Sequence, residues 1–166
     1  MQMMKFRTLA IISLFFFIEL FVTKCASVHS YKTDTEILCD DSLLNRVYKL
    51  YRLQVIEKCK QVTGTVTAVR FEEDGDYHIL LKLDIGQENL LNTFNYERQN
   101  GCLVVETVCA FLVNGKNPKV ECNNYVNKVY LPSVGERVEI IGTYVVDTKH
   151  SWTEIHPVTS ITVLKN

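Results

Sequence analysis

The chain has 166 residues, a length that suits one domain preceded by a targeting segment. Its formal net charge is -1 and its isoelectric point is about 6.4, which argues against a general binder of polyanions. Hydrophobic residues make up 47% of the chain and charged residues 22%, which excludes a disordered acidic chain.

The first 27 residues are typical of a secretory signal peptide. Lys5 and Arg7 precede an apolar run over residues 9–22, and small or polar residues follow it. The run is shorter than the roughly 20 residues that a membrane-spanning helix needs. We therefore expect cleavage near residues 25–27 and a secreted or extracytoplasmic protein. In the alternative, this segment is not cleaved and is the chain's only contact with a membrane.

The cysteine content also favours export. Six cysteines are many for a chain of this length in a reducing compartment, and no Cys-x-x-Cys pair indicates a zinc ribbon or a redox motif. Cys109 and Cys122 flank a loop that a disulfide would pin, and a loop of that size is worth about 3 kcal/mol. A bridge between Cys39 and Cys59 would tie an N-terminal arm to the domain. Loss of Cys25 with the signal peptide leaves an odd number, so one thiol stays free or pairs with a partner.

Residues 28–58 are expected to form this arm. Asp40-Asp-Ser42 precedes apolar residues at helical spacing, which indicates a short capped helix. Residues 51–56 fit an extended segment over the domain equally well. We place the folded domain at residues 59–166.

From Cys59 onward the hydrophobic period becomes two. Gly64, inside the first segment of this kind, predicts a bend or a close approach of two backbones, and Asp74-Gly75 predicts a hairpin turn. Residues 89–92 fit a single helical turn, and residues 110–132 form a long connection. The predicted strands are residues 62–69, 77–84, 103–109, 137–146 and 152–164, the last interrupted at Pro157.

This order of segments predicts an all-β fold. Two long strands, a third, a long connection and two more strands are typical of a five-stranded OB-like barrel, here with an N-terminal arm and a long loop before strand four. The segment Ser133–Gly142 is typical of the start of the fourth strand in such barrels. An open sandwich of the same strands is the alternative.

Six short motifs are spread along the chain: Val62-Thr-Gly-Thr-Val66, Asp74-Gly-Asp-Tyr-His78, Leu103-Val-Val-Glu106, Val134-Gly-Glu-Arg-Val138, Tyr144-Val-Val-Asp147 and Trp152-Thr-Glu-Ile-His-Pro157. Together they resemble a family of small exported OB-like proteins of archaea and bacteria. The resemblance covers about residues 40–164 and implies the OB-like fold. It implies no reaction, because a fold alone does not define an activity.

Polar residues on the expected outer face of the barrel form the candidate ligand site: Asp76, His78, Glu106, Trp152, Glu154 and His156. Residues two apart in a strand share a face, so Asp76 is expected beside His78, and Glu154 beside His156. His78 and His156 are candidate ligands for a divalent metal, because imidazole and carboxylate suit Zn²⁺ or Mn²⁺. In the structural alternative these pairs are surface contacts, and Trp152 fills the barrel.

No nucleophile elbow, P-loop, dinucleotide fingerprint or zincin motif occurs in the sequence. We therefore expect an exported, disulfide-stabilised OB-like binding module for an unidentified small ligand or protein. One alternative is a metal-dependent hydrolase that uses His78 and His156 with the carboxylates of Glu106 and Glu154. Another is an extracellular oligonucleotide binder, but the acidic balance and the lone Lys82 of the second strand argue against nucleic acid.

Overall fold

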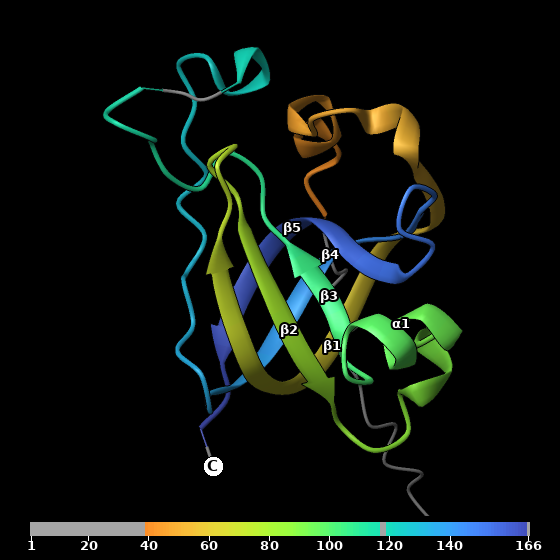
Figure 1. Ribbon diagram of the computed structural model, residues 1–166. Helices are drawn as coiled ribbons and strands as arrows, with labels where there is room; N and C mark the ends of the chain where they lie inside the picture. The colour runs from red at the N-terminus through yellow and green to blue at the C-terminus, as the bar shows by residue number, and fades with distance from the viewer. Residues whose placement is uncertain (1–38, 117–118, 166) are drawn as a thin grey trace, which may run out of the picture. The chain divides into compact units, whose positions relative to one another are not determined.

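The computed structural model describes residues 39–116 and 119–165, so the expected signal peptide lies outside the described residues. Within those two ranges, no helix is long and apolar enough to cross a membrane. The elements in chain order (Figure 1) are the 3-10 turns η1 (Asp41–Arg46) and η2 (Leu50–Arg52), strands β1 (Leu53–Phe71) and β2 (Tyr77–Leu83), η3 (Glu88–Leu90), helix α1 (Thr93–Arg98), strand β3 (Leu103–Glu106), η4 (Val120–Cys122), and strands β4 (Arg137–Asp147) and β5 (Thr153–Val163).

The five strands form one closed barrel in the order β1-β2-β3-β5-β4. Only β3 and β5 pair in parallel, and the other neighbours are antiparallel. The sheet closes because β1 is long enough to pair with β4 along its first part and with β2 along its second. Gly64 lies where these two pairings overlap, and a side chain there would collide with the Lys82 carbonyl. The predicted all-β barrel is confirmed, and the open sandwich is wrong.

β1 begins at Leu53, earlier than the period-two pattern suggested. Leu53 and Gln54 pair with Asp147 and Val146 of β4, so the end of the expected arm is part of the barrel wall. The pattern did not show this because the residues at the start of β1 are mostly exposed on both faces.

β5 also differs from its prediction, since it continues through Pro157 without a break. The pairing of β4 with β5 shifts its register on both sides of Gly142, which accommodates a residue without a backbone N–H. A side chain at Gly142 would lie 2.5 Å from the Pro157 carbonyl oxygen. The two strands therefore approach closely at this glycine.

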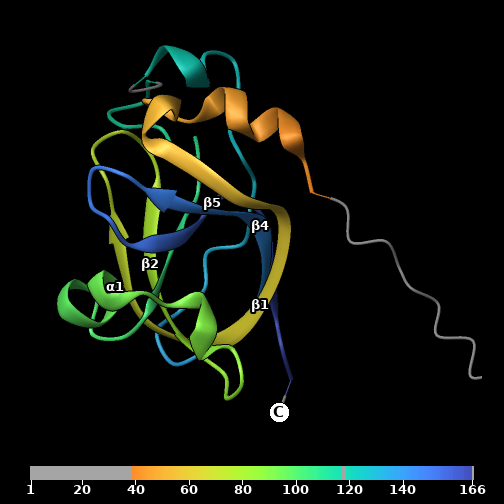
Figure 2. The same ribbon diagram turned by 90° about the vertical axis from the view of Figure 1, so that its right-hand side faces the viewer.

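Alternate residues of the strands fill the barrel with a continuous apolar core that includes Ile79, Leu81, Leu103, Ile140 and Ile155. Figure 2 shows α1 at one end of the barrel and the η1 segment at the other.

The connection over residues 85–100 holds η3 and α1, more helix than the predicted single turn. The Asn92 side chain caps α1, and its carboxamide accepts bonds from the Phe94 and Asn95 N–H groups. The Tyr144 hydroxyl donates a 2.7 Å bond to the Leu90 carbonyl. This connection is thereby fixed against the end of the barrel.

Two disulfides, Cys39–Cys59 and Cys109–Cys122, join the pairs that the sequence suggested. The second lies in a side cluster with Leu43 of η1, where it links the long connection to the N-terminal segment. Cys102 is a free, buried thiol among the described cysteines. Two disulfides in a chain of this size are typical of an oxidising, extracytoplasmic environment.

Candidate functional site

The outer face of β2, β3 and β5 is polar and yet largely buried. Glu154 and His156 of β5 are 0% and 6% exposed, and His78 of β2 is 7% exposed. His78 is the register partner of Glu106 across β2 and β3, and Glu154 lies beside Val104 across β3 and β5. The barrel wall therefore brings the residues from three strands to one face.

Glu154 is the centre of a chain of hydrogen bonds on this face. Its carboxylate accepts a 2.8 Å bond from Trp152 Nε1 and lies 3.1 Å from His156 Nδ1. A carboxylate only accepts hydrogen bonds, so His156 Nδ1 carries the proton in this contact. Glu106 Oε2 lies 3.7 Å from the same nitrogen. Glu154 thus orients the imidazole and leaves His156 Nε2 free of this network.

Charge and burial give the two histidines opposite protonation. Burial by itself would lower the pKa of His156, but the charge of Glu106 and the hydrogen bond that His156 donates to Glu154 outweigh it and raise this pKa to about 9. Burial and the Arg70 charge lower the pKa of His78 to about 4. At neutral pH, His156 is an imidazolium and His78 is an uncharged imidazole.

Glu106 completes the charged centre from β3. Burial raises the pKa of its carboxyl group to about 8, against the opposing charge of His156, and the Glu154 charge adds to the increase. Glu106 Oε2 lies 3.7 Å from His156 Nδ1, so the charge of each group shifts the pKa of the other.

Trp152 lies outside the barrel, so the prediction that it fills the interior is wrong. Its ring packs against the cluster of Leu80 and Val104 on the outer face of the wall. It also stacks on His150 at 4.4 Å between ring centroids and meets His78 edge-on at 6.3 Å. Trp152 therefore forms one wall of the space in front of the two buried histidines.

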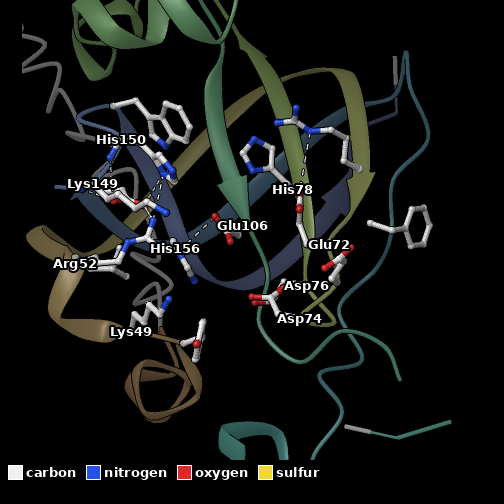
Figure 3. Close-up of a pocket in the computed structure, with 17 residues that line it drawn as sticks. Lys49, Arg52, Glu72, Asp74, Asp76, His78, Glu106, Lys149, His150 and His156 are labelled. Carbon is white, nitrogen blue, oxygen red and sulfur yellow. Dashed lines mark hydrogen bonds and ion pairs between the residues drawn. The ribbon is translucent and has the colours of Figure 1, made fainter. Parts of the chain in front are cut away.

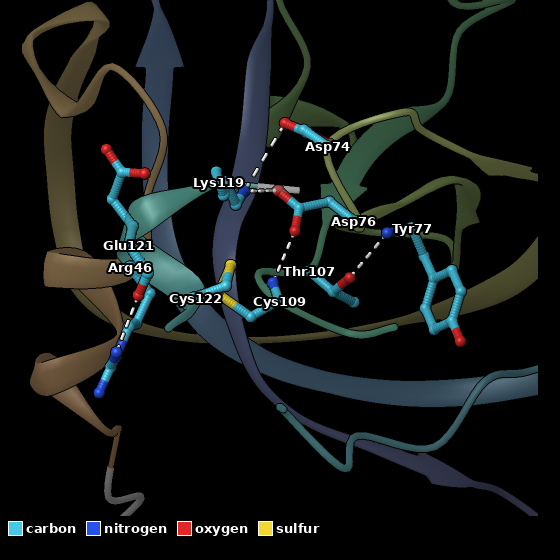
Figure 4. The surroundings of a disulfide bond; sticks show 9 residues. All are labelled: Arg46, Asp74, Asp76, Tyr77, Thr107, Cys109, Lys119, Glu121 and Cys122. Carbon is cyan, nitrogen blue, oxygen red and sulfur yellow. Dashed lines mark hydrogen bonds and ion pairs between the residues drawn. A yellow bond between two sulfur atoms is a disulfide. The ribbon is translucent and has the colours of Figure 1, made fainter. Parts of the chain in front are cut away.

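Asp76, a predicted site residue, also makes structural contacts. Its carboxylate accepts a 2.6 Å hydrogen bond from the Cys109 N–H and forms an ion pair with Lys119 (Figure 4). The Lys119 ammonium also lies 3.6 Å from the carboxylate of Asp74. Burial raises the pKa of Asp76 to about 6, although the Lys119 charge opposes this. β2 begins only at Tyr77, so Asp76 lies in the turn that precedes the strand.

A cavity of about 850 Å³ opens in front of this face (Figure 3). Its walls come from the β1–β2 turn, the start of β1 and the β4–β5 connection, and Trp152, His78, Glu106 and His156 line it. Glu154 is oriented behind it, fully buried. His78 and His156 therefore line the same cavity. The sequence alone could not show that these two residues converge.

Sequence reasoning missed the basic side of this cavity. Arg52 Nη2 lies 2.5 Å from Asp147 Oδ2, and His150 Nδ1 lies 3.0 Å from the same oxygen. Lys49 and Lys149 line the cavity next to this cluster. Arg52 belongs to the supposed arm, and nothing in the sequence pattern links it to the β4–β5 connection.

One group of donors on this face matches a metal site in type. Glu106, Glu154 and His156 each offer a ligand atom, and these atoms lie within 4.8 Å of one another. Two carboxylates and an imidazole suit Zn²⁺ or Mn²⁺. His78, the other predicted metal ligand, is not a member of this group.

No protein-family model matches the chain, and no curated protein matches its sequence. The resemblance to small exported OB-like proteins therefore stays a prediction. The chemistry of the cavity is the basis for a functional hypothesis.

Proposed function

We propose that this protein is an exported, disulfide-stabilised OB-like module that binds a small polar ligand in the cavity on the outer wall of its barrel. The strand order and the two disulfides support the scaffold part of this proposal. The cavity volume of about 850 Å³ suits a small molecule or a short chain of atoms.

One observation carries the proposal. Among the described residues, six buried side-chain polar atoms lack a hydrogen-bond partner, and four of them belong to residues that line this cavity: Arg52 Nε, Asp74 Oδ1, His78 Nε2 and His156 Nε2. A buried polar atom without a partner costs about 1–3 kcal/mol, so native proteins keep few of them. Four such atoms belong to residues around one cavity. A ligand with matching polar groups would offset the free-energy cost of leaving them without partners.

The aromatic residues favour a small ligand over an oligonucleotide. Binding of single strands needs exposed rings on which bases stack. Tyr77 instead stacks on Phe111 at 5.2 Å, and Trp152 stacks on His150. These rings are already engaged with neighbours in the protein.

A metal-dependent hydrolase is the second candidate, and the donor group of Glu106, Glu154 and His156 supports it. In that case the ion would replace the proton between His156 and the carboxylates. Calorimetry with ZnCl₂ and MnCl₂ tests this candidate. One equivalent bound by the native protein and lost in Glu106→Gln supports it, and no binding of either ion eliminates it.

Nuclear magnetic resonance of ¹⁵N-histidine-labelled protein tests the ligand-binding proposal. The panel consists of carboxylates, inorganic phosphate, amines, amino acids, short peptides and sugars at millimolar concentration. We expect at least one class to shift the ring nitrogen signals of both His78 and His156. The shift of the His78 signals should be lost in His156→Gln, and the shifts of both histidines should be kept in Lys82→Gln, a change on β2 outside the cavity. If no class moves either imidazole, the proposal is wrong.

A further inference from the structure

A second, smaller cavity of about 320 Å³ continues the first one. Both are lined by Tyr48, Glu73 and Asp74, and the smaller one extends to Val120 and Glu121 of η4. We call the two together the groove. It runs from the β4–β5 connection, past the buried histidines, to the disulfide-linked loop.

The two ends of the groove carry opposite formal charge. Lys49, Arg52 and Lys149 line one end, and Figure 3 shows them on the opposite side of the view from Asp74. Glu73, Asp74 and Glu121 line the smaller cavity at the other end. Each end also has its own counter-charge, because Arg52 pairs with Asp147, and Lys119 pairs with Asp74 and Asp76.

The buried atoms without hydrogen-bond partners also differ between the two ends, with a donor at the basic end and acceptors at the acidic end. At the basic end the unpaired atom is Arg52 Nε, which only donates hydrogen bonds. At the acidic end the unpaired atoms are Asp74 Oδ1 and Glu121 Oε2, which accept them when ionised. His78 Nε2 and His156 Nε2 lie unpaired on the larger cavity. Residues at the basic end of the groove thus include an unpaired buried donor, and residues at the acidic end include unpaired buried acceptors.

We infer that the groove takes an extended zwitterion of the peptide class, with its carboxylate at the Arg52 and Lys149 end and its ammonium at the Asp74 and Glu121 end. This inference rests on the proposed function, and it specifies the class of ligand. A free carboxylate supplies acceptors for the guanidinium and the Lys149 ammonium. A free amine supplies donors for the two acidic oxygens.

The combined volume also favours a peptide over a single amino acid. The larger cavity alone lies in the upper range of small-molecule sites, and the smaller one adds to its length. Between the charged ends, His78 and His156 line the groove, and the Nε2 atom of each has no partner in the protein. Peptide groups provide hydrogen-bonding partners along the chain.

Calorimetry with four forms of trialanine tests the inference: the free peptide, its N-acetyl form, its C-terminal amide and the doubly capped form. We expect the free peptide to bind most tightly and each single cap to weaken binding about ten-fold or more, because each removes a charged hydrogen-bonding group. Equal affinity for all four forms would overturn the inference.

Two variants test which end of the groove binds the ammonium group of the peptide and which end binds its carboxylate. Glu121→Gln should weaken binding of peptides with a free amine and leave the N-acetyl form unchanged. Lys149→Gln should weaken binding of peptides with a free carboxylate and leave the C-terminal amide unchanged. Glu57→Gln and Lys82→Gln are the matched controls, because neither residue lines the groove. If each variant weakens all forms equally, the orientation is wrong.

Inorganic phosphate and acetate, followed through the ring signals of His78 and His156, separate this inference from the proposed function. If these anions shift the imidazoles while trialanine does not bind, the cavity binds small anions and the zwitterion inference is wrong. If neither these anions, trialanine nor any other class in the panel acts on the protein, both the inference and the proposed function fail.

Discussion

Neighbouring residues on the two faces of β5 are equally buried but have opposite chemistry. On the inner face Ile155 is 0% exposed, and on the outer face its neighbour Glu154 is also 0% exposed. A period of two assigns each residue to a face, but it does not say whether that face meets water. The inner face is dry because the barrel closes, whereas the outer face is buried because Trp152 and the β4–β5 connection lie over it.

The energetic basis of the two faces therefore differs. Ile155 gains from apolar burial, which needs no directed partner. Glu154 tolerates burial only because Trp152 and His156 donate to it. Substitutions on the two faces should separate a loss of packing from a loss of charge compensation.

The largest effect is expected inside the barrel. Ile155→Ala should lower the free energy of unfolding by about 4 kcal/mol, since it leaves a cavity in a closed core. Urea denaturation with both disulfides intact measures this. Val163→Ala, near the exposed end of the same strand, should cost under about 1 kcal/mol. Equal losses at both positions would contradict this account of the inner face.

On the outer face, Glu154→Gln should lower the free energy of unfolding by about 2 kcal/mol. The amide keeps the shape of the side chain but cannot accept both the Trp152 and His156 bonds as a carboxylate does. Glu139→Gln is the control, because Glu139 lies on the partly exposed surface of β4 and its carboxylate accepts one side-chain bond, from Gln61. If the control lowers the free energy of unfolding by the same amount, the hydrogen bonds of Glu154 add no more stability than those of an ordinary surface carboxylate.

The outer face should also make stability depend on pH between 7 and 9. The pKa of His156 is raised from 6.5 to about 9 and that of Glu106 from 4.5 to about 8, so the folded state binds more protons than the unfolded state in this window. Stability is then greatest at the lower end and is lost as pH rises. We expect Tm to fall by several degrees, and the fall to be smaller in His156→Gln. A Tm that is constant or rises would contradict these pKa directions.

The smallest effect is expected at His78. Its pKa is lowered to about 4, and its Nε2 has no partner, so the imidazole contributes neither charge nor a hydrogen bond through that atom at neutral pH. His78→Gln should change the free energy of unfolding by under about 1 kcal/mol. Chemical denaturation at pH 7 measures this. A loss comparable to that of Glu154→Gln would show that His78 is structural.

Much of the fold follows from local sequence chemistry. The alternation of Ile79 and Leu81 and the turn at Asp74-Gly75 are set by neighbours in the chain. Gly64 is different, because the need for a glycine there comes from the Lys82 carbonyl on the adjacent strand. The paired cysteines also lie at the ends of a short loop, where proximity in sequence favours proximity in space.

The site could be predicted only in part. The candidate residues on β2, β3 and β5 were identified because strand parity places each of them on the outer face of its own strand. That the three strands bring them to one cavity depends on the strand order, which parity does not give. Arg52 and Lys149 could not be found in this way, because their approach depends on the closure of the barrel between β1 and β4. Asp76 lines the cavity together with His78, but its ion pair with Lys119 could not be predicted, because Lys119 comes from an irregular loop without a period.

The parallel seam between β3 and β5 is the shortest pairing in the barrel, with register partners at Val104–Glu154 and Val105–Ile155. Glu106 follows on one side of this seam and His156 on the other. Local opening there would separate the two residues without unfolding the rest of the wall. Any molecule that bridges Glu106 and His156 should therefore slow deuterium uptake at the seam amides more than at those of the long β1–β4 pairing.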